Sequence, residues 1–502
     1  MKNQTYGLHP YQQADIERLL SRLTLRKAQA RLLYQLPTGG GKTHVFTELV
    51  RRFICTRESK ALVLTHRREL CRQTARTLSN AGVANTMINQ CTRTIPAKSH
   101  CYVAMVETLK NRIEEGLFDP NKVGLVIIDE AHHNAFRPLL DVFIAAQLIG
   151  VTATPLSSNR EYPLYKTYDE LITGKSIAEL IAENYLAKPH TVEYDVELSS
   201  LHTGDNGDYT VSTSDSLYSS SAMLDLVLDA YRKQAEGKKT LIFNHGIFTS
   251  REVCRHFEDA GYAIRHLDHH ASEDERGGIL RWFKKTPDAI LTSVSILTTG
   301  FDEPGVQCVI LNRATTSFTL FHQMIGRGSR YLARKRTFTI LDLGNNTARF
   351  GPWHDPVDWS SIFRDPEHYY SMMQRQGESE DGPVTTGLRS KFPNTLQLGF
   401  DIQEAWHEKE RKGEKTRHVI RDAIRQHARM CIENSESISA AVELAGALNK
   451  EIAHRVKEYG KCMGKVTRDY LVWLENDYKR RLVGLIKKLM PKSPTQSFSI
   501  PA

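Results

Sequence analysis

The sequence predicts an α/β protein with two successive parallel β-sheets, each covered by helices, followed by a mainly helical C-terminal domain. Three observations predict it. Short β-rich apolar runs alternate with amphipathic segments over the first 155 residues, the alternation resumes after a polar gap, and the last hundred residues show only helical periodicity. Parallel strands need crossover connections, usually helices, so repeated strand–helix units indicate parallel sheets covered on both faces.

The first lobe is predicted from runs of mostly apolar residues that are each followed by a helical pattern. The runs are residues 30–37, 60–67, 100–107, 123–130 and 146–154. Residues 68–82 form one of the amphipathic segments between them. We therefore expect residues 1–156 to be one α/β lobe.

A second lobe is predicted for residues 221–351. Its strand-like runs are residues 238–246, 262–270, 288–295, 306–313 and 336–344, with helices expected at 251–261 and 273–285. Residues 157–220 between the lobes are predicted to be an interlobe connector. Within it, residues 174–186 have a helical pattern, and the polar, turn-rich residues 201–221 are expected to be exposed.

The chain changes character again after the second lobe. Residues 352–395 combine prolines, aromatic residues and a polar stretch, which predicts a linker. Residues 396–490 are predicted to form a basic helical domain, and residues 491–502 a disordered tail. The apolar residues near a 3.5-residue period are Val466, Tyr470, Trp473, Leu474, Leu482, Leu485 and Leu489.

Composition excludes several classes of protein. With 502 residues, 40% of them apolar, and a mean hydropathy of −0.42, the chain is neither disordered throughout nor built to span a membrane. The eight cysteines form no CxxC pair, and the histidine pairs at 132–133 and 269–270 lack HExxH spacing. We therefore expect no zinc, no disulfide framework and no membrane partner. We also expect a reducing cytoplasmic location, associated with the nucleoid if the source is bacterial.

The charge favours a polyanionic partner. The net charge is +9, and residues 401–492 hold 20 Lys and Arg against 14 Asp and Glu. Most of the excess therefore lies in the C-terminal fifth of the chain. Many basic proteins bind no nucleic acid, so this charge gains meaning only together with motifs.

The strongest motif is LPTGGGKT, residues 36–43, which lies between an apolar run and a helical pattern. After Thr38, Gly39, Gly40 and Gly41 let backbone N–H groups turn towards phosphate oxygens at a helix N-terminus. Lys42 is then placed to reach the β- and γ-phosphates of a nucleotide, and Thr43 to help hold Mg²⁺. The alternative is a glycine-rich turn with a chance lysine.

An acidic pair follows the apolar run at residues 123–128. Asp129 and Glu130 stand where a parallel strand ends, which is the edge of the sheet where such folds bind ligands. Asp129 suits Mg²⁺, and Glu130 suits orienting and deprotonating an attacking water. Alone, the pair would fit a solvated acidic turn, but together with a phosphate loop it favours phosphoryl transfer.

A basic segment in the second lobe completes this chemistry. Arg327 and Arg330 are three residues apart, so on a helix they share one face. Guanidinium groups there can stabilise the charge that develops on a transferred phosphoryl group, provided that the lobes close on the nucleotide. The alternative is a basic surface helix.

In this order the motifs resemble those of superfamily 2 helicases with two RecA-like lobes, most closely the bacterial RadD and XPB-like DEAH group. The resemblance covers residues 8–351. LHPYQ at residues 8–12 resembles an adenine-side motif. The other motifs are Ia at 65–73, Ib at 103–109, II (DEAHH) at 129–133, III (TATP) at 152–155, IV at 241–246, V (TTGFDEPG) at 298–305 and VI (QMIGRGSR) at 323–330.

The resemblance implies further roles. Gln12 would contact the base, and Asp302 and Gln323 would lie near the nucleotide. The residues implied to line the strand-binding face are Thr65, His66, Arg67 and Thr108 in the first lobe and Asn244 and Thr292 in the second. The residues implied to couple the nucleotide state to that face are His132, Thr152 and Thr154. Thr65 and Thr108 could instead cap helices, and Thr152 and Thr154 could lie inside strands. Met105 stands where relatives often carry threonine, and the zinc-binding cysteines of some RadD relatives have no counterpart after Arg330.

The resulting expectation is an ATP- and Mg²⁺-dependent helicase or translocase that acts on single-stranded or forked DNA. RNA, or movement along duplex DNA without strand separation, is the alternative. A non-enzymatic scaffold would not require the intact Lys42, Asp129 and Glu130. The basic C-terminal helices, with Trp473 and Tyr478, have three possible roles: binding phosphates and bases, packing on the second lobe, or contacting a protein partner.

Overall fold

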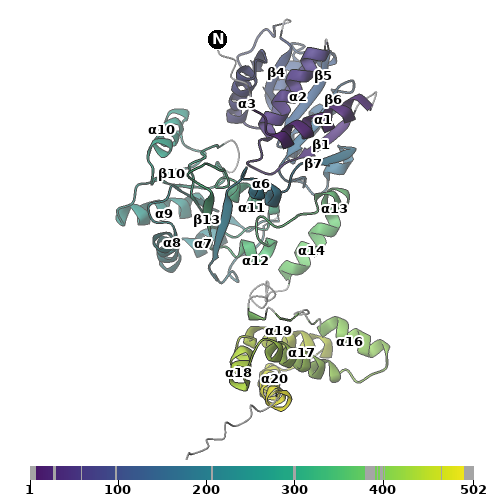
Figure 1. Cartoon of the computed structure of the whole chain (residues 1–502), viewed down its shortest axis with the longest axis vertical. Coiled ribbons are helices and arrows are strands. Elements are labelled where there is room, and N and C mark those ends of the chain that lie inside the picture. Colours follow the sequence, from purple (N-terminus) through teal and green to yellow (C-terminus); the bar gives the residue numbers. More distant parts are fainter. Residues whose placement is uncertain are drawn as a thin grey trace, which may run out of the picture. The chain divides into compact units, whose positions relative to one another are not determined.

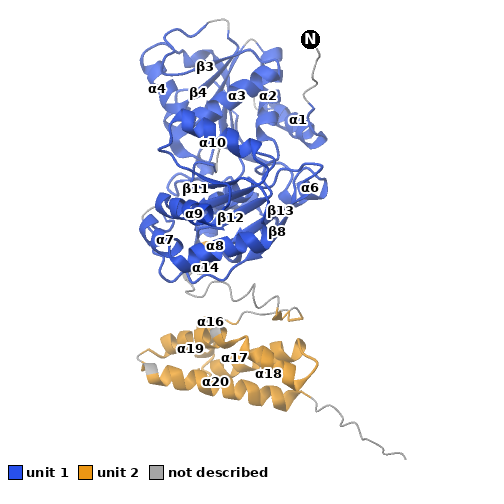
Figure 2. Cartoon of the chain, turned by 90° about the vertical axis from the view of Figure 1, so that its left-hand side faces the viewer, with its two compact units in different colours: residues 1–372 blue, residues 373–502 orange. Residues whose placement is uncertain are grey.

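The computed structural model describes residues 7–25, 30–57, 59–96, 99–204, 207–297, 301–378, 391–392, 394–395, 400, 402–464 and 466–490. The chain divides into two compact units, residues 1–372 and 373–502 (Figure 2). Both β-sheets belong to the first unit, and the second unit is helical. No helix in the described ranges is long and apolar enough to cross a membrane.

The first sheet has seven parallel strands in the order β3-β4-β2-β5-β6-β1-β7 (Figure 1). Its strands are β1 (Arg31–Gln35), β2 (Lys60–Thr65), β3 (Asn85–Ile88), β4 (Cys101–Met105), β5 (Val123–Asp129), β6 (Gln147–Thr152) and β7 (Glu170–Thr173). Its helices are α1 (Pro10–Leu25), α2 (Lys42–Thr56), α3 (Arg68–Asn80), α4 (Val106–Glu114) and α5 (Arg137–Leu140). The five predicted strands are present, whereas β3 and β7 were not predicted.

The second sheet has six parallel strands in the order β10-β11-β9-β12-β13-β8. They are β8 (Lys188–Glu193), β9 (Thr240–Asn244), β10 (Ile264–Leu267), β11 (Ile290–Ser293), β12 (Cys308–Asn312) and β13 (Thr337–Asp342). The helices of this half are α6 (Ile177–Ala182), α7 (Val211–Tyr218), α8 (Ser221–Gln234), α9 (Ile247–Asp259), α10 (Glu273–Lys285), α11 (Phe318–Ile325) and α12 (Asn346–Phe350). The predicted fold class, two RecA-like lobes, is confirmed.

The strand register brings the motifs to one edge of the first sheet. Gln35 at the end of β1 lies opposite Thr152, and Asp129 at the end of β5 lies opposite Val151. The carboxyl ends of these strands therefore coincide, as parallel pairing requires. The central strand β5 is almost wholly buried, since its Val, Leu and Ile side chains are covered on both faces of the sheet.

The predicted interlobe connector, residues 157–220, also contributes a strand to each sheet. It supplies β7, which pairs with β1, and β8, which pairs with β13, so each sheet gains an edge strand from it. The prediction that residues 201–221 are exposed is wrong for part of the segment. Tyr218 is 1% exposed and donates a hydrogen bond to the carbonyl of Leu343. The carboxylate of Asp208 is also bound tightly to the second lobe.

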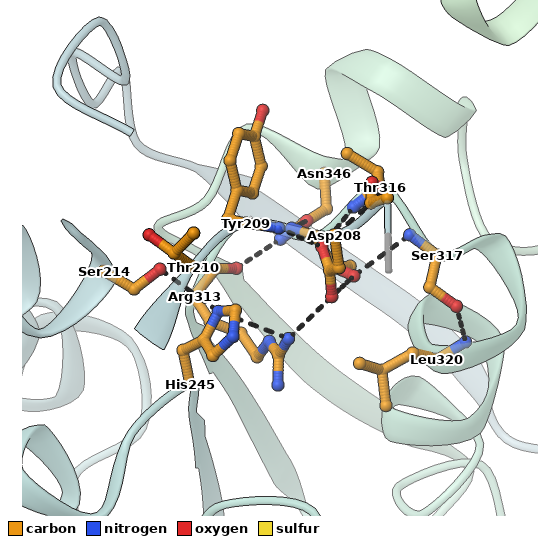
Figure 3. A network of polar contacts seen from close by, with 12 residues as sticks. Asp208, Tyr209, Thr210, Ser214, His245, Arg313, Thr316, Ser317, Leu320 and Asn346 are labelled. Atoms are coloured by element: carbon orange, nitrogen blue, oxygen red, sulfur yellow. Dashed lines mark hydrogen bonds and ion pairs between the residues drawn. The ribbon is translucent and has the colours of Figure 1, made fainter. Parts of the chain in front are cut away.

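Asp208 anchors this segment through a network of polar contacts (Figure 3). Its carboxylate accepts hydrogen bonds from Arg313 Nη2 at 3.0 Å, Thr315 Oγ1 at 2.9 Å and the Thr316 backbone N–H at 2.8 Å. In addition, the backbone N–H of Thr315 donates a hydrogen bond to Asn346 Oδ1 at 2.9 Å. Together these bonds set the path of the loop between β12 and α11.

The predicted linker, residues 352–395, is also corrected in its first part. Residues 352–372 pack on the lobes: Trp353 is 2% exposed and contacts Phe338, and Phe363 is buried with the core of the first lobe. This segment forms α13 (Trp359–Arg364) and the start of α14 (Pro366–Glu378). Most of residues 379–399 lies outside the described residues.

The second unit is helical, as predicted. Its helices are α16 (Ile402–Arg411), α17 (His418–Glu433), α18 (Ile438–Gly446), α19 (Asn449–Met463) and α20 (Arg468–Leu489). The core side of α20 carries residues four positions apart: Leu474, Tyr478, Leu482 and Ile486. The predicted tail, residues 491–502, lies outside the described residues.

Candidate nucleotide site between the two lobes

The phosphate loop joins β1 to α2, which begins at Lys42. Gly39 and Gly41 have φ values of +94° and +86°, a region that residues with a Cβ rarely adopt. A Cβ on Gly39 would lie 2.7 Å from Leu186 Cδ2, and one on Gly41 would lie 2.4 Å from Gln12 Nε2. Glycine is therefore required here both by backbone conformation and by close neighbours.

Gln12 and Tyr11 hold the loop from α1. Gln12 Nε2 donates a hydrogen bond to the Gly40 carbonyl at 3.1 Å, and the Tyr11 hydroxyl donates to the same oxygen at 2.7 Å. Gln12 Oε1 accepts from the His9 N–H at 2.9 Å. The structure thus places Gln12 against the loop backbone. The role of Tyr11 was not predicted, although it precedes Gln12 directly in the sequence.

The acidic pair lies beside Lys42 at the end of β5. Asp129 and Glu130 are buried, and Glu130 has a φ of +54°, which is strained for a residue with a side chain. Burial and the neighbouring Glu130 charge raise the pKa of Asp129. For Glu130, burial would raise the pKa, but the charge of Lys42, together with that of Arg327, outweighs it and holds the pKa below its usual value. Glu130 is therefore a carboxylate at neutral pH.

The chemistry of these groups fits Mg²⁺ held together with nucleotide phosphates. The described residues contain no group of three or more His, Cys, Asp and Glu side chains that could hold a metal ion by itself. Mg²⁺ usually takes one or two protein ligands and completes its shell with phosphates and water. The carboxylate of Asp129 and the hydroxyl of Thr43 are oxygen donors of the kind that such a site uses. Glu130 Oε2 is buried and accepts no hydrogen bond from the described residues, so its capacity to accept one is unused.

The second lobe brings two arginines to the loop. Arg330 Nε donates to Asp302 Oδ1 at 2.9 Å, and Arg330 Nη1 would lie only 3.0 Å from a Cβ on Gly39. Arg327 Nη1 donates to the Phe301 carbonyl at 2.6 Å. Burial lowers the pKa of Arg327 to about 10, so it stays protonated at neutral pH. Thr38 packs on Gly326, where a Cβ would come within 2.6 Å of Thr38 Cβ.

A hydrogen-bonded path crosses between the lobes. His132 Nδ1 lies 3.0 Å from Thr152 Oγ1, and His132 Nε2 lies 3.3 Å from Gln323 Nε2. Burial lowers the pKa of His132 to about 4, so its ring is neutral. An amide nitrogen can only donate, so His132 Nε2 accepts from Gln323, and its Nδ1–H donates to Thr152. Thr154 Oγ1 adds a second bridge, to Thr319 Oγ1 at 3.1 Å.

Most of the side chains predicted to contact a strand are buried in the structure, and their role in strand binding stays a prediction. Thr65, Asn244 and Thr292 have no exposed surface, and Thr108 is 9% exposed. Asn244 Nδ2 donates to Thr292 Oγ1 at 2.7 Å, and Asn244 Oδ1 accepts from Asn312 at 2.8 Å. These polar side chains satisfy one another across neighbouring strand ends, because an unpaired buried polar group is costly.

His66 and Arg67 are half-buried at the lobe boundary. The ring of His66 lies 4.3 Å from that of His133, and burial lowers the pKa of His66 to about 3. Arg67 Nη1 donates to the Ile296 carbonyl of the second lobe at 3.4 Å. Of motif V, residues 298–300 lie outside the described residues.

Ion pairs between α3 and α10 were not predicted. Arg68 and Arg72 on α3 both pair with Glu273 at the start of α10, at 2.8 and 3.2 Å. In return, Arg276 on α10 pairs with Glu69 on α3 at 2.7 Å. Charged residues at the starts of helices were visible in the sequence, but the pairing of these two helices was not.

Two family comparisons match one lobe each. Residues 5–157 match the family of the type III restriction enzyme res subunit, and residues 220–331 match the helicase conserved C-terminal domain.

Individual proteins match across both lobes. The ATP-dependent helicase IRC3, as it is named in Saccharomyces cerevisiae, is 30% identical over 365 residues, 67% of this chain and 51% of that protein. The chain thus spans about half the length of IRC3. A 51.5 kDa protein of a Lactococcus phage is 28% identical over 75% of this chain and 80% of its own length. The fold is similar to a fragment of an HsdR subunit of a type I restriction enzyme from Vibrio vulnificus, with a TM-score of 0.56 and 24% identity, over 68% of this chain and 65% of that one.

Proposed function

We propose that this chain, a member of the superfamily 2 helicases by its two matched domains and two RecA-like lobes, couples ATP hydrolysis to movement along nucleic acid. The observation that carries the proposal is the meeting of two half-sites. The first lobe supplies the phosphate loop and the acidic pair, and the second lobe brings Arg330 against Gly39 of that loop. Efficient hydrolysis then requires closed lobes.

Each side chain of the site has a separate role in ATP hydrolysis. Lys42 and the N–H groups of the loop bind the phosphates, and Thr43 and Asp129 would hold Mg²⁺, which neutralises charge on the phosphate oxygens when bound. Glu130 is ionised, and its buried Oε2 accepts no hydrogen bond from the described residues, so this oxygen would orient the attacking water and accept its proton. Arg327 and Arg330 offset the charge that develops on the transferred phosphoryl group.

The neutral His132 links hydrolysis to lobe position. It lies between Glu130, Thr152 of the first lobe and Gln323 of the second. Opening of the lobes breaks the bond to Gln323 and the bond between Thr154 and Thr319. The state of the nucleotide thereby changes the separation of the two lobes, which is what stepping along a strand requires.

We propose DNA as the track and the DEAH group related to RadD and XPB as the subfamily. The support for DNA is the restriction-enzyme family matched by the first lobe and the net charge of +9. The support for the subfamily is the DEAHH sequence and the order of the motifs. Repair, recombination or replication in the cytoplasm is the proposed setting. RNA, and duplex translocation without unwinding, are the competing substrate and mode.

The test compares ATP binding with ATP turnover. Lys42→Ala is expected to lose both, because the phosphates lose their cation. Glu130→Gln is expected to bind ATP and stall hydrolysis, because the amide cannot take the proton of the water. Glu114→Gln, an exposed acid of α4, is the matched control and should behave as wild type. Turnover that persists in Lys42→Ala would overturn the assignment of this site.

Strand displacement then separates the modes of movement. An unwinding enzyme releases the labelled strand of a forked duplex in the presence of ATP. A duplex translocase leaves the fork intact but displaces a third strand from a triplex.

A further inference from the structure

Helix α20 carries a surface strip of aromatic and basic residues that the proposed mechanism does not use. The strip consists of Tyr470, Trp473, Arg480, Arg481, Lys487 and Lys488. With 3.6 residues per turn, these positions fall within about a third of the helix circumference, so they lie on one side of the helix. At about 1.5 Å per residue the strip is about 27 Å long, with the aromatic residues at the N-terminal end and the basic residues beyond them.

The two aromatic rings are open to solvent. Trp473 is 54% exposed and Tyr470 is 37% exposed, and their ring centroids lie 5.6 Å apart at an interplanar angle of 30°. A tryptophan this exposed beside a second exposed ring offers a flat apolar surface. Tyr478, which the sequence grouped with Trp473, is not part of it, because it is fully buried and bonds His427 Nδ1 at 2.9 Å.

The core of the second unit does not need these rings. Leu474, Tyr478, Leu482 and Ile486 fill that core from the other side of α20. These four residues already provide the apolar face with which α20 packs on its own domain. Packing in this domain therefore does not explain why Trp473 is present on the exposed side.

The basic end of the strip is positively charged overall. Arg480 and Arg481 both pair with the buried Asp477, which holds their guanidinium groups on this side of the helix. Lys487 and Lys488 are exposed and have no ion-pair partner in the described part of the chain. One acid against four cations leaves the basic end of the strip, residues 477–488, with three positive charges, whereas the exposed Asp469 lies beside the aromatic end.

We propose that this strip binds single-stranded nucleic acid, with bases stacked on Trp473 and Tyr470 and the phosphate backbone following the basic residues. Exposed aromatic rings in line with a positive groove or ridge are the two elements by which proteins bind single strands without sequence preference. The inference rests on the proposed function for its nucleic-acid track and adds a second contact in the C-terminal unit.

An anionic membrane fits the strip less well. A helix that binds a membrane surface presents a broad apolar face, and the apolar face of α20 is buried in its own domain. The two rings are too small a surface for that mode, and the exposed Val472 lies away from them on the helix.

The test uses the full chain, without nucleotide, and a fluorescein-labelled 30-nucleotide oligo(dT), followed by anisotropy at several NaCl concentrations. Trp473→Ala is expected to weaken binding about tenfold, because stacking of one base is lost. Trp473→Phe should keep most of the affinity. Val472→Ala, an equally exposed neighbour, is the matched control and should have no effect.

The charges are tested by the salt dependence. Lys487→Gln with Lys488→Gln is expected to reduce the slope of log K against log salt by about 1.4, which is about 0.7 for each lost phosphate contact on a single strand. Lys412 is an exposed lysine of the same unit, between α16 and α17. Lys412→Gln should leave the slope of log K against log salt unchanged.

The outcomes separate this inference from the proposed function. Hydrolysis of ATP without nucleic acid is expected to be unchanged in all of these variants. If the wild type hydrolyses no ATP either with or without nucleic acid, the proposed function fails. If hydrolysis is present but the affinity for oligo(dT) and the salt slope do not respond to the variants, the inference fails alone. It also fails if Trp473→Ala abolishes sedimentation with phosphatidylserine vesicles and leaves DNA binding intact.

Discussion

The bond between His132 and Gln323 is expected to carry coupling between the lobes, and a double-mutant cycle measures it. The two Nε2 atoms lie 3.3 Å apart, and the residues are 2% and 6% exposed. Gln323→Ala removes the donor and leaves a buried acceptor on the ring of His132. The variants are His132→Ala, Gln323→Ala and the combination of both.

The magnitude follows from burial. A buried polar atom left without its partner costs about 1–3 kcal/mol, which lowers the turnover rate about 5- to 150-fold if the bond forms only in closed lobes. Once one partner is gone, removing the other cannot break the same bond again. The loss in the double variant should therefore fall short of the summed single losses by at least about 1 kcal/mol.

The assay is the kcat of ATP hydrolysis at saturating nucleic acid, with ATP affinity measured separately. Glu114→Gln combined with Gln323→Ala is the control cycle, because the exposed Glu114 of α4 pairs with Lys110 rather than with His132 or Gln323. In this control cycle, the loss of transition-state stabilisation in the double variant should equal the sum of the two single losses within about 0.5 kcal/mol. If the losses of turnover in His132→Ala and Gln323→Ala are also additive, the hydrogen bond between these residues does not couple the lobes.

Three further predictions concern single residues. Arg327→Ala should keep ATP affinity and lose turnover by about a thousandfold or more, whereas the exposed control Arg334→Ala should not; unchanged turnover in Arg327→Ala would remove its catalytic role. Burial lowers the pKa of His322 to about 3, so the folded chain resists protonation that an unfolded histidine accepts below about 6.5. Stability should therefore fall by about 2 kcal/mol between pH 7 and 5 through this residue, and His322→Gln should flatten the dependence in denaturant unfolding; an equal dependence in both proteins would contradict the burial effect. Asp208→Ala leaves Arg313, 5% exposed at its side chain, without its carboxylate and should cost about 3–5 kcal/mol of unfolding free energy; a loss under about 1 kcal/mol would show that the network is not structural.

Strongly patterned elements were predictable from the sequence. The central strands β2, β5 and β9 are continuous runs of Val, Leu, Ile and Phe, because both of their faces are buried, and no other element gives that pattern. The phosphate loop was predictable for a related reason. Three glycines before Lys42 fit a cradle with positive φ and serve few other purposes.

The missed elements lack such patterns. The edge strand β8, KPHTVE, is polar because one side faces solvent, and α7 is rich in Ser and Thr, which locally favour turns. Only their tertiary partners, such as β13 for β8, stabilise them.

The residues predicted to contact a strand show a second limit of sequence-based prediction. Asn244 and Thr292 are polar residues at strand ends, and in a sequence they are indistinguishable from residues that bind a ligand. Their neighbours in space are one another and Asn312, a pairing that follows only from the strand order β11-β9-β12.

The central claim is that nucleic acid and ATP act through the same pair of lobes. The most direct measurement is steady-state ATP hydrolysis without nucleic acid and with single-stranded DNA, duplex DNA or RNA, using Lys42→Ala as the blank. The account predicts that one form of DNA stimulates turnover strongly and that the Lys42→Ala signal stays at background. Equal turnover under all four conditions would contradict it.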